Sequence, residues 1–261
     1  MNEKNFDVAI FGNGLTAKVM CLVALHCGVN FINIRKKEKK ENKPDDIRSL
    51  ALSSASKNML KILGVNPISQ PVEKMIVFEG GVSNDKIKGS VIFDSNELHE
   101  QIANICEYSV INKSIENNLS LDSKNSIAGV PISIIDEGNY SKIVFKNKSI
   151  IKSKLNIFTE KLDTGLQKIT NVEYDLSDYD QTAITTTLEH SKDNKGYAYQ
   201  LFLKNGPLAL LPLKKIKSKN FTSLVWTEKT SNVSEILAAR GGLEESLNQM
   251  CGLYLGKIKV S

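Results

Sequence analysis

The residues best placed for chemistry are two glycines near the amino terminus, Gly12 and Gly14. They follow an apolar stretch, residues 6–11, and precede a helix-forming segment. Gly12 permits a tight turn, Gly14 has no side chain to hold a phosphate away from the backbone, and Ala17 is small where the helix would meet the sheet. A pyrophosphate could rest on the free N–H groups of the helix that starts near Leu15. The spacing therefore predicts a dinucleotide-binding loop, although a glycine pattern alone also fits an ordinary strand-to-helix turn.

Two arginines are further candidates for contact with the same ligand. A predicted strand over residues 29–34 puts Arg35 about 20 residues after the glycines, where a dinucleotide fold usually offers an acidic side chain to the ribose hydroxyls. A cation there suits a 2′-phosphate, or it indicates that ribose recognition is weaker or is made by other groups. Arg48 stands just before a predicted helix that ends at Gly64. A solvated surface position is the alternative interpretation of Arg48.

Residue types that carry acid–base, nucleophilic or metal chemistry are scattered along the chain. The three histidines lie in different predicted elements, and we assign no catalytic role to any of them. The four cysteines have neither metal-ligand nor C-x-x-C spacing, and we expect them to be reduced core residues. No catalytic triad, metal cluster or carboxylate pair is apparent in the sequence, so the glycine loop is its main chemical signal.

The helices and strands that would position this loop are unevenly distributed along the chain. A helix is expected over residues 15–27, and the apolar spacing predicts another from Ser95 through Ile105. Later residues are mostly β-rich, with a closing helix over residues 234–250. Prolines bracket the apolar residues 206–213, so that segment cannot form a long helix. Strands are predicted over residues 75–78, 90–93, 130–135, 142–145, 155–158, 181–189, 197–203, 221–226 and 255–260.

Length and charge narrow the class of protein. The chain has 261 residues, 41% of them hydrophobic, which is enough for one large domain or two smaller ones. The net charge of +5 owes much to lysines within residues 36–40. No aromatic residues interleave that cluster, so we expect no nucleic-acid partner, while contact with an anionic membrane surface remains open. The chain starts without a secretory apolar region and its apolar runs are too short to span a bilayer, so we predict a cytoplasmic protein.

Three passages resemble, in their order along the chain, the ubiquinone-biosynthesis hydroxylases. These are FAD-dependent aromatic monooxygenases related to para-hydroxybenzoate hydroxylase. The second passage contains an Arg-x-x-Ala-Leu-Ser motif that begins at Arg48. The third is the most specific, because a generic dinucleotide fold has no reason to carry it. The passages are residues 7–17, residues 48–64, and residues 179–183, 206–213 and 223–227 together.

The resemblance implies an α/β protein with two domains. A Rossmann-like FAD-binding domain with a mostly parallel sheet would comprise residues 1–70 and 96–170. An inserted substrate domain with a mostly antiparallel sheet would comprise residues 71–95 and 171–261.

The resemblance also implies roles for particular residues. Gly12, Gly14 and Ala17 would hold the FAD pyrophosphate, Arg48 would be a cationic contact near it, and Arg35 would stand at the ribose. The segment 206–213 would lie close to the flavin or to the aromatic ring of the substrate.

The chemistry implied by the family comes from the cofactor. FAD, reduced by NAD(P)H, activates dioxygen for hydroxylation of an electron-rich phenol ring, and the protein supplies orientation and excludes water. The substrate would be an aromatic small molecule or a lipid-like, polyprenylated phenol. Other ubiquinone-synthesis proteins would be partners, and the cytoplasmic protein would contact the inner membrane peripherally.

Three departures from the family's pattern keep alternatives open. Arg35 replaces the acidic ribose contact, Glu160 or Asp163 would have to substitute in part for an Asp-Gly motif, and the chain stops at Ser261, where a C-terminal Gly-Asp region is expected. The second hypothesis is therefore a truncated or degenerate, non-catalytic relative with weak or no FAD binding. A third, an NADP-linked reductase suggested by Arg35, leaves the third passage unexplained.

Overall fold

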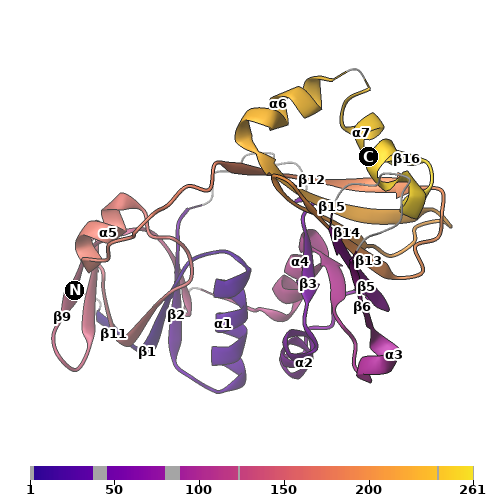
Figure 1. The fold of residues 1–261 in the computed structure, drawn as a ribbon. Helices are drawn as coiled ribbons and strands as arrows, with labels where there is room; N and C mark the ends of the chain where they lie inside the picture. Colours follow the sequence, from indigo (N-terminus) through magenta and orange to yellow (C-terminus); the bar gives the residue numbers. More distant parts are fainter. Residues whose placement is uncertain (1–2, 38–45, 80–88, 123, 240, 261) are drawn as a thin grey trace. The chain divides into compact units, whose positions relative to one another are not determined.

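The structure is a computed structural model, and it describes residues 3–37, 46–79, 89–122, 124–239 and 241–260 (Figure 1). The chain divides into two compact units. Unit 1 comprises Met1–Pro44, Leu63–Val65 and Asn112–Leu176, and unit 2 comprises Asp45–Ile62, Asn66–Ile111 and Ser177–Ser261. Residues 45–62, 66–70 and 96–111 thus group with unit 2, whereas the predicted boundaries put them in the FAD-binding domain. Residues 171–176 group with unit 1, whereas the predicted boundaries put them in the substrate domain. The assignment of one domain to FAD and the other to substrate stays a prediction.

Unit 1 is built on a six-stranded sheet in the order β8-β2-β1-β11-β10-β9. The first four strands run parallel to one another, and the last two continue the sheet antiparallel. Helix α1 (Leu15–His26) follows the central strand β1 directly. The strands are β1 (Glu3–Phe11), β2 (Phe31–Arg35), β8 (Ser126–Ala128), β9 (Pro131–Asp136), β10 (Ser141–Phe145) and β11 (Ile150–Phe158).

Both faces of the central strand β1 are buried, which explains its nearly continuous apolar sequence. Ala9 and Phe11 face one cluster with Ile32 and Ile34 of β2. The neighbouring residue Ile10 faces the opposite cluster, which includes three residues of α1: Ala17, Cys21 and Ala24. The small side chains of α1 therefore lie against the sheet, as the helix–sheet contact of a dinucleotide fold requires.

Two further helices belong wholly or partly to unit 1. Helix α4 (Tyr108–Asn118) carries Asn112 and Glu116 one turn apart. Helix α5 (Thr164–Thr170) begins after Asp163, whose side chain accepts a hydrogen bond from the Leu166 N–H at 2.9 Å. An aspartate at this N-cap position satisfies one of the free amides of the helix.

Unit 2 contains a seven-stranded sheet, β16-β12-β15-β14-β13-β5-β6, and a three-stranded sheet, β3-β7-β4. All their pairs are antiparallel except β13 with β5. The α/β fold class with one mostly parallel and one mostly antiparallel sheet is confirmed. The strands are β3 (Ser49–Leu52), β4 (Gln70–Pro71), β5 (Lys74–Glu79), β6 (Ser90–Asp94), β7 (Asn104–Glu107), β12 (Gln181–His190), β13 (Tyr197–Leu203), β14 (Gly206–Pro212), β15 (Asn220–Lys229) and β16 (Ile258–Val260).

The main core of unit 2 lies between its large sheet and helix α7 (Gly242–Leu255). Leu247, Cys251 and Leu255 of the helix pack with strand residues that include Leu208 and Trp226, and all five side chains are buried. The expectation that Trp226 is a core residue is thus confirmed. Helices α2 (Ser54–Ile62), α3 (Ser95–Leu98) and α6 (Thr230–Ala238) complete the unit (Figure 1).

Three sequence expectations were wrong in detail. The helix expected from Ser95 through Ile105 ends at Leu98, because His99 adopts a left-handed conformation (φ 52°) and Ile105 pairs within β7. The closing helix expected over residues 234–250 is two helices, α6 and α7, with Gly241 in a left-handed conformation (φ 79°) just before α7. One cysteine, Cys27, is exposed at the end of α1, while Cys21, Cys106 and Cys251 are buried.

No helix within the described ranges is long and apolar enough to cross a bilayer.

A buried histidine, His190, ends strand β12. Its Nδ1 lies 2.8 Å from the Lys192 carbonyl oxygen and therefore carries the proton, while its Nε2 accepts from the Thr222 hydroxyl at 2.9 Å. Asn194 donates to the same hydroxyl oxygen at 3.1 Å. Burial lowers the pKa of His190, and the nearby carboxylate of Asp193 opposes this shift only in part. The network thus fixes a neutral imidazole.

This network predicts a pH-dependent stability. The pKa of His190 is lower in the folded protein than in the unfolded chain. Its contribution to the free energy of unfolding is therefore complete above a pH of about 6.5 and is lost as the pH falls. We expect the thermal midpoint to drop by a few °C between pH 7.5 and 5, and His190→Asn to reduce that drop. The exposed His99→Asn is the control, and an equal pH dependence in all three proteins contradicts the prediction.

Candidate dinucleotide-binding site

The glycine loop lies at the carboxyl ends of parallel strands in unit 1. Phe11, the last residue of β1, pairs with Ile34 of β2 and with Phe158 of β11. Gly12 has a φ of +136°, which side-chain-bearing residues rarely adopt, and a Cβ there would overlap the Thr159 hydroxyl. The loop thus has the backbone position that a dinucleotide fold uses for its pyrophosphate.

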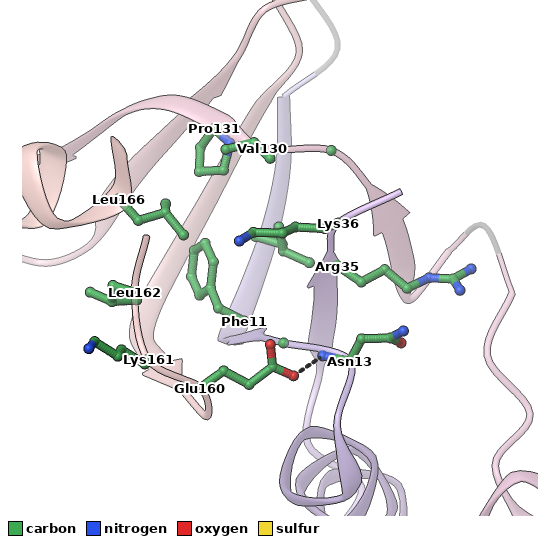
Figure 2. A pocket seen from close by; sticks show the side chains of 13 residues that line it. Phe11, Asn13, Arg35, Lys36, Val130, Pro131, Glu160, Lys161, Leu162 and Leu166 are labelled. Carbon is green, nitrogen blue, oxygen red and sulfur yellow. Dashed lines mark hydrogen bonds between the residues drawn. The ribbon is translucent and has the colours of Figure 1, made fainter. Parts of the chain in front are cut away.

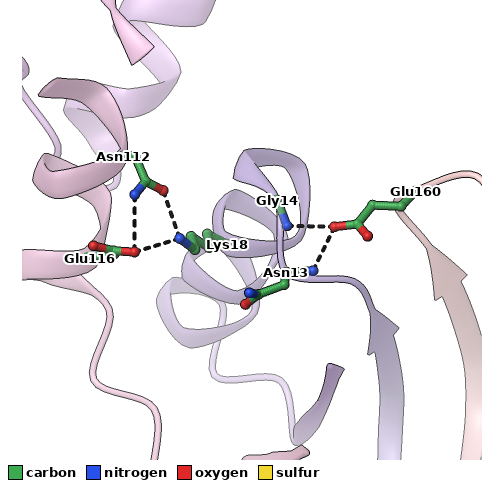
Figure 3. A network of polar contacts seen from close by, with 6 residues as sticks. All are labelled: Asn13, Gly14, Lys18, Asn112, Glu116 and Glu160. Atoms are coloured by element: carbon green, nitrogen blue, oxygen red, sulfur yellow. Dashed lines mark hydrogen bonds and ion pairs between the residues drawn. The ribbon is translucent and has the colours of Figure 1, made fainter. Parts of the chain in front are cut away.

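The amides at the start of α1 are bound by a side chain of the protein itself. Glu160 Oε1 accepts from the backbone N–H of Asn13 at 2.7 Å and from that of Gly14 at 2.6 Å (Figure 3). Gly14 is the N-cap residue of α1 and offers no side-chain cap, so the carboxylate caps the helix from outside it. A carboxylate oxygen therefore stands where an oxygen of a bound phosphate would accept.

Thr159, beside Glu160, ties the end of β11 to the loop. Its backbone N–H and its hydroxyl both donate to the Phe11 carbonyl oxygen, at 3.0 and 2.8 Å. The backbone of residues 159–160 is thus held independently of the Glu160 side chain. Sequence reasoning named Glu160 as a partial substitute for a missing motif, but gave no sign that its carboxylate binds the loop.

A small hollow of about 60 Å³ lies next to the loop (Figure 2). This volume is far below the roughly 300–1,000 Å³ typical of ligand pockets. Its floor is apolar, and its charged lining is three cations and one carboxylate. The lining comprises Phe11, Gly12, Asn13, Ile34, Arg35, Lys36, Gly129, Val130, Pro131, Glu160, Lys161, Leu162 and Leu166.

Cationic groups occupy the end of β2, where a ribose-binding acid is usual. Arg35 lines the hollow, and its Nε donates to the Ser126 hydroxyl at 3.2 Å. Lys36 Nζ lies 2.8 Å from the carboxylate of Asp163, and this lysine lowers the pKa of that carboxyl. The structure therefore brings Gly12, Arg35 and Glu160 to one place, and it pairs the carboxylate of Asp163 with Lys36, the residue that follows β2.

The other two predicted site residues have different surroundings. Ala17 is buried between α1 and the sheet, where a larger side chain would push the helix away. Arg48 lies in unit 2, forms an ion pair with Asp46 and stacks over the Tyr108 ring at 4.8 Å. The Asp46 carboxylate raises the pKa of Arg48 further. Contact of Arg48 with a cofactor stays a prediction.

A second cavity, of about 280 Å³, lies within unit 2. Leu213, at the end of the apolar segment singled out in the sequence, is part of its wall. Sequence reasoning missed its polar groups, Gln70, Glu107 and Thr187, because they come from three separate strands. The lining comprises Ile68, Ser69, Gln70, Ile105, Glu107, Val110, Thr187, Leu213, Lys214, Lys215, Ile216 and Phe221.

The described residues contain no group of three or more His, Cys, Asp and Glu side chains that could hold a metal ion.

The chain is similar to several curated proteins and solved structures, although no model of a protein family matches it. It is 23% identical over 247 residues to 3-demethoxyubiquinol 3-hydroxylase of Escherichia coli (strain K12), covering 90% of this chain and 61% of that protein. It is 24% identical over 257 residues to the mitochondrial ubiquinone biosynthesis monooxygenase COQ6 of Danio rerio, covering 89% of this chain and 51% of that protein. With COQ6 of Rattus norvegicus it shares 30% identity over 109 residues, 41% of this chain and 22% of that protein.

Two of the solved structures with this fold are described as monooxygenases. PqsL from Pseudomonas aeruginosa, a probable FAD-dependent monooxygenase, has a TM-score of 0.72 at 11% identity, covering 99% of this chain and 73% of PqsL. The p-nitrophenol 4-monooxygenase PnpA from Pseudomonas putida DLL-E4 has a TM-score of 0.68 at 12% identity, covering 99% of this chain and 67% of PnpA.

The chain therefore has the fold of the FAD-dependent monooxygenases. Its relatives in sequence are the ubiquinone-biosynthesis monooxygenases, which confirms the resemblance predicted from its motifs. The chain spans 61% or less of the length of the three curated relatives described above.

The loop geometry predicts a specific cost of substitution at Gly12. We expect Gly12→Ala to lower the free energy of unfolding by about 1 to 3 kcal/mol more than Gly138→Ala, because the new Cβ overlaps Thr159. Gly138 also has a positive φ (+84°), but nothing lies within 4 Å of the position that a Cβ would take there, so it is a matched control. Urea unfolding followed by circular dichroism measures both. Equal losses would contradict the close approach of Thr159.

Proposed function

We propose that this chain is the cofactor- and substrate-binding part of an FAD-dependent hydroxylase acting on an aromatic, polyprenylated phenol in ubiquinone biosynthesis. The observation that carries the proposal is similarity to a ubiquinol hydroxylase over 90% of the chain. The glycine loop at the ends of parallel strands adds the expected place for a dinucleotide.

The residues of unit 1 fit the cofactor on one condition. Gly12 and Gly14 allow a diphosphate to approach the backbone, and Arg35 stands where the ribose would lie. The condition is that the Glu160 carboxylate turns away, because it holds the N–H groups of Asn13 and Gly14. When bound and reduced by NAD(P)H, FAD would supply the activation of dioxygen.

The cavity of unit 2 suits the aromatic ring of the substrate. Its volume of about 280 Å³ is close to the lower bound for ligand pockets, and its wall is largely apolar. The polar groups available to orient a phenol hydroxyl are those of Ser69, Gln70, Glu107, Thr187, Lys214 and Lys215. The apolar wall would exclude water around the ring.

A polyprenyl tail makes the membrane the natural source of such a substrate. The proposal therefore includes a cytoplasmic location with peripheral contact to the inner membrane, and association with other proteins of ubiquinone synthesis. The cations at residues 36–37 favour an anionic surface.

Two observations favour a second candidate, a non-catalytic relative with weak or no FAD binding. Glu160 occupies donors that a diphosphate needs, and Arg35 replaces the usual ribose acid. An unmade polar contact of this kind costs about 1 to 3 kcal/mol of binding free energy.

The absorbance spectrum of the purified protein separates the two candidates. A hydroxylase is expected to show a bound flavin, and to consume oxygen with NAD(P)H faster when a phenol is added. A colourless protein that gains no flavin from added FAD would support the non-catalytic relative and overturn the hydroxylase.

The cavity assignment has its own test, the substitution Ile216→Trp. Ile216 lines the cavity and is 56% exposed, so the larger ring should narrow the cavity without loss of folding. We expect roughly tenfold weaker binding of an alkylphenol by calorimetry, with FAD binding unchanged. The control is Ile92→Trp, at a residue 55% exposed on β6 and outside the cavity lining. Equal phenol affinities in both variants would refute the assignment.

A further inference from the structure

The loop of unit 1 carries an anion of its own, the carboxylate of Glu160. We propose that Glu160 determines the affinity of this site by competing with the diphosphate of a dinucleotide for the N–H groups of Asn13 and Gly14. The proposal rests on the proposed function for the identity of the ligand. This competition would lower the affinity for the cofactor, because the carboxylate must leave the two amides before the diphosphate can bind them.

The geometry shows why both anions cannot occupy the loop. A single oxygen, Oε1, accepts from both amides, at 2.7 and 2.6 Å. The same oxygen lies 3.2 Å from the position of a Cβ on Gly14. The space left open by the absent side chain of Gly14 is therefore filled by the carboxylate. A phosphate oxygen would meet a like charge and find its donors taken.

The attraction that holds Glu160 comes from the backbone of α1. The helix has 12 residues and no acidic residue in its first turn, so its positive end is not neutralised from within. Lys18, one turn into α1, donates to Asn112 at 2.7 Å and to Glu116 at 2.6 Å (Figure 3). The Lys18 ammonium group is thus paired with α4 rather than with Glu160. The donors at the loop are backbone amides, which serve a carboxylate and a phosphate alike.

The side chain can leave without loss of the local backbone. Thr159 already joins β11 to β1 through two hydrogen bonds to the Phe11 carbonyl. Glu160 is exposed, so its carboxylate can be hydrated after it rotates. Arg35 and Lys161 line the hollow beside it and offer positive charge nearby (Figure 2). Rotation of this one side chain would free both amides.

The test compares Glu160→Gln and Glu160→Ala with the unaltered full chain. Calorimetry with FAD and with ADP is expected to show about tenfold lower Kd in both variants, because the competing charge is gone. The Kd of adenosine, which has no phosphate, should be the same in the variants and in the unaltered chain. Glu137→Gln removes the same charge from an exposed turn of unit 1 and should leave every Kd unchanged.

The thermal midpoint without nucleotide provides the second readout. Both Glu160 variants should melt at a lower temperature, because Ala removes the acceptor that caps α1 and Gln keeps an acceptor without the charge, yet both should be stabilised more by added ADP. A purely structural role would give the lower midpoint with no gain in affinity, and would overturn the proposal. An increase in Kd would overturn it as well, since Glu160 would then assist binding. If Glu160→Ala does not fold, the isosteric Glu160→Gln decides the same question.

The ADP measurements separate this proposal from the hydroxylase. Binding of ADP by the variants but not by the unaltered protein supports competition even if the protein never hydroxylates a phenol. Equally tight FAD binding by all proteins refutes competition and leaves the hydroxylase standing. Absence of ADP binding in every variant also refutes competition.

Discussion

The parallel pairing of β1 with β2 on one side and with β11 on the other is the constraint on which unit 1 depends. Phe11 is in register with both Ile34 and Phe158, so the three strands end at the same level. Parallel strands present their carboxyl ends at one edge of a sheet, and the loops that follow them must meet there. Asn13 and Glu160 are thereby brought into contact although they are 147 residues apart in sequence.

The free amides at the start of α1 have to be satisfied whether or not a ligand is present. Here a carboxylate from the neighbouring strand end satisfies two of them, while Lys18 is held by α4. This arrangement satisfies the amides without a ligand. If a dinucleotide binds here as proposed, the same carboxylate places a negative charge beside the negatively charged diphosphate, so the contact that holds the loop in place would weaken binding.

In unit 2 the corresponding constraint is the hairpin of β14 and β15. Gly206 has a φ of +156° and lies against the Thr227 carbonyl, where a Cβ would not fit. With β14 and β15 paired in this register, the Leu213 N–H donates to the Phe221 carbonyl oxygen at 3.0 Å. Both residues line the cavity. The sequence passage that resembles the ubiquinone-biosynthesis hydroxylases most specifically therefore contributes Leu213 to this wall.

The sequence by itself determined the fold class, the loop and the family resemblance, because these depend on local patterns: an apolar run before Gly12, small residues in α1, and the proline-bracketed strand. It did not determine that Ile105 would be a strand residue, since the same apolar spacing fits a helix until pairing with β3 is known. Only the tertiary structure decided that Glu160 caps α1 and that Gln70, Glu107 and Thr187 share a cavity. Contacts between distant strand ends follow from sheet order and register, which no local pattern records.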